Sequence, residues 1–223
     1  MAEPEILFER RGHAGLVTLN RPGALNALSH GMVTALAQAL EGWRDDPEVR
    51  VVIVRAVGRA FCAGGDIRAV YEAGQGSPAQ KAFFEAEYRL NAAIKAFPKP
   101  YVALIDGYVM GGGAGISVHG SHRVFAEKAV FAMPETGIGF FPDVGSSFFL
   151  SRMPSQIGLY CALGAIRLAR GDALYAGIAT HAAPAAAFDA IVARLAEAED
   201  VDAVISEFAE PASPETLGSL APA

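Results

Sequence analysis

The sequence contains little cysteine. Only Cys62 and Cys161 occur among 223 residues. Two isolated cysteines cannot form a disulfide framework, and neither has the clustered Cys and His neighbours that a zinc site requires. Because nothing in this pattern needs an oxidising environment, we expect a protein of the reducing cytoplasm.

Signals for membranes and nucleic acids are also missing. No apolar run reaches the length of a transmembrane helix. Residues 1–11 carry three glutamates and lack the apolar core of a secretory signal. Lys and Arg number 18 against 24 Asp and Glu, giving a net charge of −6 without any basic run. We therefore expect a soluble protein with no membrane and no nucleic-acid partner.

The chain is long and apolar enough for one sizeable core, with 52% hydrophobic residues. We expect a catalytic core in residues 1–150 and a helical C-terminal region in residues 151–223, where Ala and Leu are frequent. Residues 197–223 are acidic and contain three prolines, so fraying is expected at the end of the chain.

Alternating strands and helices predict an α/β fold. Residues 6–8 and 16–19 predict a hairpin, and Ser29 is expected to cap an amphipathic helix that ends near residues 45–47. Residues 51–54 and 101–105 are apolar without alternation, which is typical of strands buried on both faces. A helix is expected over residues 79–97, and short strands over 123–125 and 129–132. Such alternation favours parallel strands joined by right-handed connections.

Each of the two buried strands leads to a glycine-rich turn. The first turn is Ala63-Gly64-Gly65-Asp66, and the second is Gly111-Gly112-Gly113, after which residues 116–118 are expected to open a helix. Free N–H groups at such turns attract negative charge, and two turns together can form an oxyanion hole. Either turn alone is explained as well by tight packing. Because Ile116 breaks the GxGxxG pattern, a dinucleotide site is disfavoured.

Three carboxylates are candidates for acid–base work. Glu135 and Asp143 lie eight residues apart in one loop, residues 134–145, with apolar neighbours. Two carboxylates can divide acid and base roles when their environments separate their pKa values. Glu87 lies on the apolar stripe of its helix, where a carboxylate needs either a structural partner or a ligand.

Other reactive side chains receive no role. Ser117 lacks the GxSxG context of a nucleophile elbow. His119 and His122 are three residues apart, a spacing that ordinary packing explains better than metal binding. Cys62 is expected to be a small buried residue.

The segments FCAGGDI (residues 61–67) and IDGYVMGGGAGISVHGSHRVFAEKAVFAMPETGIGFFPDVGSS (residues 105–147) carry a family resemblance. They resemble the crotonase (enoyl-CoA hydratase/isomerase) superfamily, and within it the 3-hydroxyisobutyryl-CoA hydrolase branch. The resemblance extends from about residue 6 to residue 181. It implies a crotonase-like fold of repeated ββα units, with a helical C-terminal region that is shortened in this chain.

The resemblance also implies roles for particular residues. The N–H groups of Gly65 and Gly112 would form the oxyanion hole. Glu135 would be the catalytic glutamate, acting either as general base for water or as nucleophile. Asp143 would lie near a substrate hydroxyl, and Glu87 would contact the substrate.

The function implied is hydrolysis of an acyl-CoA thioester, with 3-hydroxyisobutyryl-CoA as the expected substrate and valine catabolism as the process served. Coenzyme A would enter as part of the substrate, and no separate cofactor or metal is expected. Arg21, Arg59, Arg68 and Lys99 are candidate contacts for its phosphates and equally ordinary surface cations.

Two alternatives stay open. Hydratases of the superfamily carry a second catalytic glutamate where this chain has Gly115, which disfavours an enoyl-CoA hydratase or isomerase. A shortened relative could also bind CoA esters without turnover, and apolar surface left bare would promote self-association, so a homo-oligomer is left open.

Overall fold

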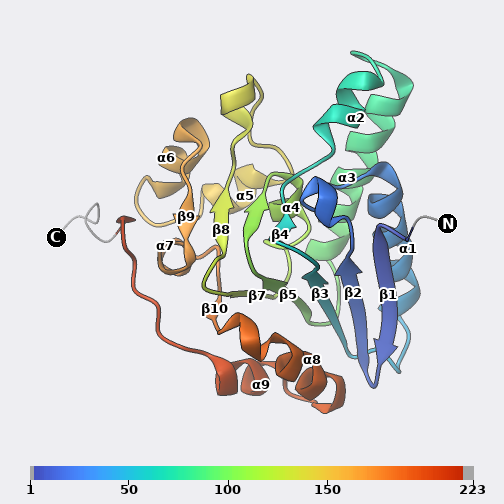
Figure 1. The fold of residues 1–223 in the computed structure, drawn as a ribbon, viewed down its shortest axis with the longest axis vertical. Helices are drawn as coiled ribbons and strands as arrows, with labels where there is room; N and C mark the ends of the chain where they lie inside the picture. The colour runs from blue at the N-terminus through green and yellow to red at the C-terminus, as the bar shows by residue number, and fades with distance from the viewer. Residues whose placement is uncertain (1–2, 218–223) are drawn as a thin grey trace.

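The computed structural model describes residues 3–217, which form two sheets surrounded by helices (Figure 1). The larger sheet has the strand order β1-β2-β3-β5-β7-β10, and the smaller sheet has the order β4-β6-β8-β9. The strands are β1 Ile6–Arg11, β2 Ala14–Leu19, β3 Val51–Ala56, β4 Ala60–Cys62, β5 Tyr101–Ile105, β6 Tyr108–Met110, β7 His122–Phe125, β8 Val130–Ala132, β9 Leu168–Ala169 and β10 His181–Ala182.

The helices follow the strands in alternation. They are η1 Pro22–Ala24, α1 His30–Arg44, α2 Ile67–Glu72, α3 Pro78–Lys95, α4 Gly112–Gly115, η2 Glu135–Ile138, α5 Ser146–Leu150, α6 Ile157–Gly164, α7 Arg170–Tyr175, η3 Ala185–Ala187, α8 Phe188–Glu197 and α9 Val201–Phe208. None of the helices in the described part of the chain combines the length and the apolar character needed to cross a membrane.

The α/β fold predicted from the sequence is confirmed. Strands β1 and β2 form the expected antiparallel hairpin, and β2, β3, β5, β7 and β10 run parallel. The side chain of Ser29 accepts a hydrogen bond from the N–H of Met32 and so caps α1. Strand β5 spans the five residues that were expected, and all five are buried.

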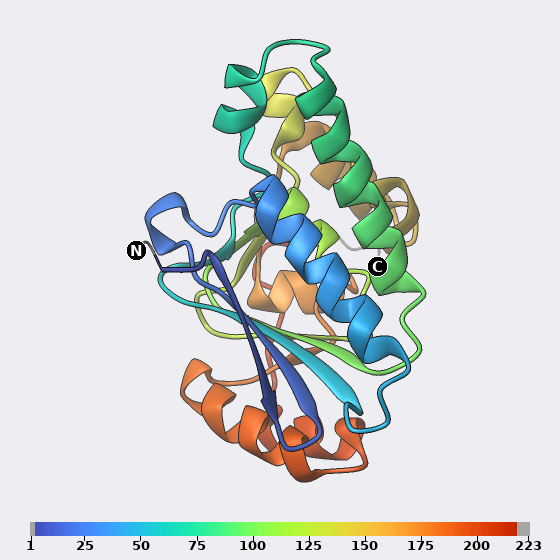
Figure 2. The same ribbon diagram turned by 90° about the vertical axis from the view of Figure 1, so that its right-hand side faces the viewer.

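The larger sheet is covered on both faces, as its apolar strands predicted. Val52 and Val54 belong to the core that contains Leu36 of α1, whereas Ile53 belongs to a second core with Ile191 of α8. Figures 1 and 2 show α8 and α9 grouped on one side of this sheet, away from α1 and α3. Alternate residues of one strand therefore stabilise two separate layers.

One expectation about local structure is wrong, and one is incomplete. The helix expected over residues 116–118 is instead α4, which begins at Gly112 and ends at Gly115, because the positive φ of 48° at Gly111 turns the chain into the helix earlier. The region after residue 151 is mostly helical, as expected, and it also adds two short strands that were not predicted, because β9 pairs with β8 and β10 pairs with β7. Two-residue strands are too short to produce a sequence pattern.

The boundary placed at residue 150 stays a prediction, although Ile157 and Cys161 belong to the same core as Leu36. Near the end of the described chain, the carboxylate of Asp172 accepts hydrogen bonds from the N–H groups of Thr216 and Leu217. The fraying expected at the end of the chain falls on residues 218–223, outside the described residues.

Two helical glycines should respond in opposite ways to alanine. A Cβ on Gly113 of α4 would lie 2.3 Å from the carbonyl oxygen of Cys62, which is backbone, whereas a Cβ on Gly42 of α1 would meet nothing within 4 Å. We expect Gly113→Ala to lower the free energy of unfolding by roughly 1–3 kcal/mol. Gly42→Ala should raise it by about 0.5–1 kcal/mol, because alanine restricts the unfolded chain. Urea unfolding of both variants measures the difference, and a neutral Gly113→Ala would contradict the close approach.

Candidate active site

The two glycine turns lie side by side. Parallel strands β4 and β6 are neighbours, and each leads into one of the turns. A Cβ on Gly112 would lie 3.1 Å from the nitrogen of Gly65, and a Cβ on Gly64 would lie 3.8 Å from the nitrogen of Gly112. Gly64 has a φ of 117°, in the region that favours glycine. The structure therefore brings together the two turns that the sequence predicted. Glycine suits Gly64 because of its positive φ, and it suits Gly112 because the other turn lies so close.

Gly65 and Gly112, the predicted oxyanion donors, lie next to each other where the two turns meet. Gly112 is the first residue of α4, so its N–H has no acceptor within the helix. Gly65 pairs with Leu28 in an isolated parallel β-bridge. The two hydrogen bonds of this bridge are made by the carbonyl of Gly64 and the N–H of Asp66, so the bridge does not use the N–H of Gly65. An oxygen that develops negative charge between the turns would meet two such donors.

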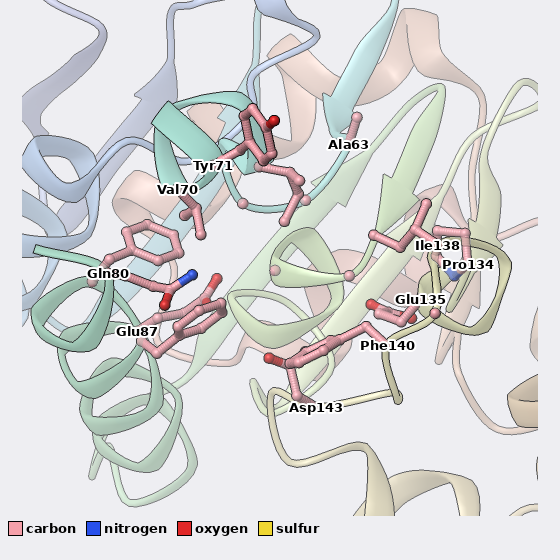
Figure 3. A pocket seen from close by; sticks show the side chains of 18 residues that line it. Ala63, Val70, Tyr71, Gln80, Glu87, Pro134, Glu135, Ile138, Phe140 and Asp143 are labelled. Atoms are coloured by element: carbon pink, nitrogen blue, oxygen red, sulfur yellow. The ribbon is translucent and has the colours of Figure 1, made fainter. Parts of the chain in front are cut away.

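Two buried carboxyl groups approach this glycine pair. A Cβ on Gly112 would lie 2.4 Å from Oε1 of Glu87, and a Cβ on Gly111 would lie 2.9 Å from Oε1 of Glu135. Glu87 is 2% exposed and Glu135 is 7% exposed. Figure 3 shows Glu87 reaching into the cavity from α3, with Glu135 and Asp143 on the other side. Sequence reasoning named all three, and the structure gathers them around one cavity.

Burial sets the protonation of these acids. It raises the pKa of Glu87 to about 8, with a further contribution from the negative charges of Asp143 and Glu135. Burial also raises the pKa of Glu135 to about 7, partly opposed by a backbone hydrogen bond. The pKa of Asp143 is raised overall, because the effect of burial exceeds the opposing effect of the hydrogen bond from the Tyr88 hydroxyl. Within residues 3–217, Oε1 of Glu87 and Oε2 of Glu135 have no hydrogen-bond partner.

The cavity is also lined by apolar side chains. Its volume is about 340 Å³, a size suited to a small organic group. The wall includes Val70, Tyr71, Phe84, Ile138 and Phe140. Phe84 of α3 stacks on Phe140 of the loop, with ring centroids 6.1 Å apart. The cavity therefore combines polar groups, at the glycine turns and the carboxylates, with an apolar lining.

Tyr88 is a residue that sequence reasoning missed. Its hydroxyl donates a 2.6 Å hydrogen bond to Oδ2 of Asp143 and so joins α3 to the loop after η2. The two residues are 55 positions apart. The only signal in the sequence is that Tyr88 adjoins Glu87 on the same helix.

Cys62, Ser117 and His122, to which the sequence analysis gave no catalytic role, are buried or hydrogen-bonded within the fold. The thiol of Cys62 is fully buried, and burial raises its pKa to about 12, so the thiolate is strongly disfavoured. Ser117 donates its hydroxyl hydrogen bond to the carbonyl of Gly113. His122 contacts Asp202 of α9 at 2.9 Å. Among the described residues, no group of three or more His, Cys, Asp or Glu side chains could hold a metal ion.

The basic side chains considered for phosphate binding differ in how they are used. The ammonium group of Lys99 donates to the carbonyls of Trp43 and Asp46. Arg21 forms ion pairs with Glu5 and Asp66. Lys99 therefore stabilises the C-terminal end of α1. Contacts between these basic residues and the phosphates of coenzyme A stay a prediction.

Comparisons with known proteins agree with this site. A model of the enoyl-CoA hydratase/isomerase family matches residues 14–222. Curated relatives include the mitochondrial 3-hydroxyisobutyryl-CoA hydrolases of Xenopus tropicalis and Homo sapiens. The first is 56% identical over 79% of this chain and 46% of its own length, and the second is 50% identical over 81% of this chain and 47% of its own. The chain thus spans about half the length of these relatives.

The expectation of a cytoplasmic protein is wrong. It is contradicted by the curated relatives, which are named as mitochondrial proteins. A low cysteine content fits any compartment that keeps thiols reduced, so it could not distinguish between the two.

Solved structures share the fold closely. A carnitinyl-CoA dehydratase from Mycobacterium thermoresistibile superposes with a TM-score of 0.92 and 42% identity, over 98% of this chain and 64% of that one. An enoyl-CoA hydratase from Rhodobacter sphaeroides 2.4.1 has a TM-score of 0.88 and 41% identity, over 97% of this chain and 64% of that one. These matches confirm the crotonase-like fold that the family resemblance implied, and the chain belongs to the enoyl-CoA hydratase/isomerase family.

Proposed function

We propose that this chain is an acyl-CoA thioester hydrolase whose substrate is 3-hydroxyisobutyryl-CoA or a similar short 3-hydroxyacyl-CoA. The observation that carries the proposal is the meeting of two buried carboxyl groups, Glu87 and Glu135, at the paired glycine turns. Identity of 50–56% to curated hydrolases over about four fifths of the chain supports the same reaction. With that substrate, the protein would serve valine catabolism.

The thioester carbonyl binds between the two turns. Its oxygen accepts hydrogen bonds from the N–H groups of Gly65 and Gly112, which strengthen as negative charge develops on the oxygen. Such donors are fixed by the backbone, so they need no reorganisation during the reaction. Each one is worth about 2.7–4 kcal/mol in the transition state.

Glu135 activates the attack on the carbonyl carbon. Because its pKa is about 7, a substantial fraction of this carboxylate is ionised near neutral pH. It either accepts a proton from the attacking water or attacks the carbon itself and is then released by water. In both cases the C–S bond breaks, the sulfur of coenzyme A leaves and takes up a proton, and the carboxylic acid is the other product.

Glu87 and Asp143 orient the substrate. With a pKa of about 8, Glu87 keeps its proton near neutral pH and donates a hydrogen bond to the bound acyl group. Asp143 accepts from the 3-hydroxyl group. Coenzyme A enters and leaves as part of substrate and product, and we assign no separate cofactor.

Gly115 disfavours the alternative of a hydratase. A Cβ at this position would lie 2.8 Å from Nδ2 of Asn91 and 2.9 Å from Cβ of Val144. A second catalytic glutamate has no space there, so the two-acid addition of water lacks a partner. Hydrolysis needs only one base near the carbonyl.

The first test is release of free thiol from 3-hydroxyisobutyryl-CoA, followed with a thiol reagent for the wild type and for Glu135→Gln. We expect turnover by the wild type and a loss of roughly 10²–10⁴-fold in kcat in the variant, because the amide cannot accept a proton or attack. Binding of the CoA ester by the variant serves as the control for folding. Wild-type protein that hydrates crotonyl-CoA, or binds CoA esters tightly without thiol release, would reject the hydrolase assignment.

The dependence of kcat/KM on pH should be bell-shaped. The rate rises as Glu135 loses its proton near pH 7 and falls as Glu87 loses its proton near pH 8. In Glu87→Gln the fall on the alkaline side should disappear, because glutamine does not titrate. A variant that keeps the alkaline limb unchanged would show that another group controls it.

A further inference from the structure

Val144 adopts an unusual backbone conformation beside Asp143. Its φ is 45°, in the left-handed region, and it is followed by Gly145 with a φ of 77°. A β-branched residue enters this region at a cost of about 1–3 kcal/mol and stays there only when its surroundings hold it. The side chain of Val144 is 2% exposed, so the surroundings are protein.

His119 holds the backbone of Val144. Its Nε2 lies 2.7 Å from the carbonyl oxygen of Val144, and because a carbonyl only accepts, the ring nitrogen is the donor. Burial lowers the pKa of His119, partly opposed by the hydrogen bond to Val144, and the charges of Lys95 and Arg123 lower it further. A Cβ on Gly145 would lie 2.8 Å from this ring. The imidazole therefore fits closely under the turn.

Gly115 provides room for the Val144 side chain. Its own φ is not positive, so its backbone does not demand glycine, yet a Cβ there would lie 2.9 Å from Cβ of Val144. Gly115 and His119 thus form a socket for Val144. Gly115 and His119 lie in the same segment as Gly112, the proposed oxyanion donor. Residues 112–119 therefore link the position of this donor to that of Asp143.

We propose that His119 is a positioning residue for Asp143: by donating a hydrogen bond to the Val144 carbonyl, it fixes the turn that directs the Asp143 carboxylate into the cavity. The hydroxyl of Tyr88 donates a 2.6 Å hydrogen bond to the same carboxylate. The charges that face Asp143 are those of Glu87 on α3 and Glu135 in η2. This role deepens the proposed hydrolase function and rests on it for its kinetic consequence.

The direct test is a carbon-13 NMR titration of the Asp143 carboxyl group in the wild type and in His119→Phe. Phenylalanine keeps the ring and its packing against Phe149 but cannot donate. We expect the pKa of Asp143 to fall toward its ordinary value in this variant, because a loosened turn admits water to a carboxyl group whose pKa burial raises. His119→Gln, which keeps a donor, should restore much of the wild-type value.

A matched control is His122→Phe, which removes another buried histidine, one whose partners are Ser121 and Asp202. It should leave the Asp143 titration unchanged. If His119→Phe does not fold, Gly115→Ala crowds Val144 from the other side and should shift the titration in the same direction. An unchanged pKa in a folded His119→Phe or Gly115→Ala variant, or an equal shift in His122→Phe, overturns the proposal.

Kinetics separate positioning from stability. We expect His119→Phe to lower kcat/KM roughly 10-fold in the wild-type background and to have little further effect in an Asp143→Asn background. Equal losses in both backgrounds would contradict a role through Asp143. A wild type that is inert toward the thioester would reject the hydrolase function alone, and the NMR titration would still decide the role of His119.

Discussion

The close approach of the Gly64-Gly65 turn to the Gly111-Gly112 turn is the constraint on which the rest of the site depends. Neighbouring parallel strands β4 and β6 bring both turns to one edge of the smaller sheet, and any Cβ on Gly112 would meet the nitrogen of Gly65 at 3.1 Å. A side chain at this position would have to displace its neighbours. Next to this contact, α3 and η2 place the carboxyl groups of Glu87 and Glu135.

The second constraint is that acids gather in this space without a nearby cation. Among the described residues that line the cavity there is neither lysine nor arginine. Burial therefore acts on the carboxyl groups unopposed by positive charge, and it separates Glu87, with a pKa of about 8, from Glu135, with a pKa of about 7. A site that keeps one acid protonated and the other partly ionised can donate and accept protons at neutral pH. The folded core must offset the cost of burying these groups.

Much of this architecture was predictable, because periodicity and turn composition are local signals. Strand β5, the Ser29 cap and both glycine turns followed from short stretches of sequence. The strands β9 and β10 did not, because two residues carry no pattern. The links from Tyr88 to Asp143 and from His119 to Val144 join residues 55 and 25 positions apart, so only the folded chain shows them. Roles for Glu87, Glu135 and Asp143 came from family resemblance, and their gathering around one cavity came from the structure.

The most direct measurement of the central claim is the free energy of unfolding as a function of pH for the wild type and Glu87→Gln. Unfolded glutamate loses its proton near pH 4.5, whereas folded Glu87 keeps it until about pH 8. Between these values the folded state binds more protons, so wild-type stability should fall as the pH rises through this window. The stability of Glu87→Gln should fall less steeply, so it should rise relative to that of the wild type between pH 4.5 and 8 and stop rising above pH 8. Parallel curves for the two proteins would contradict a buried, protonated Glu87 at the glycine turns.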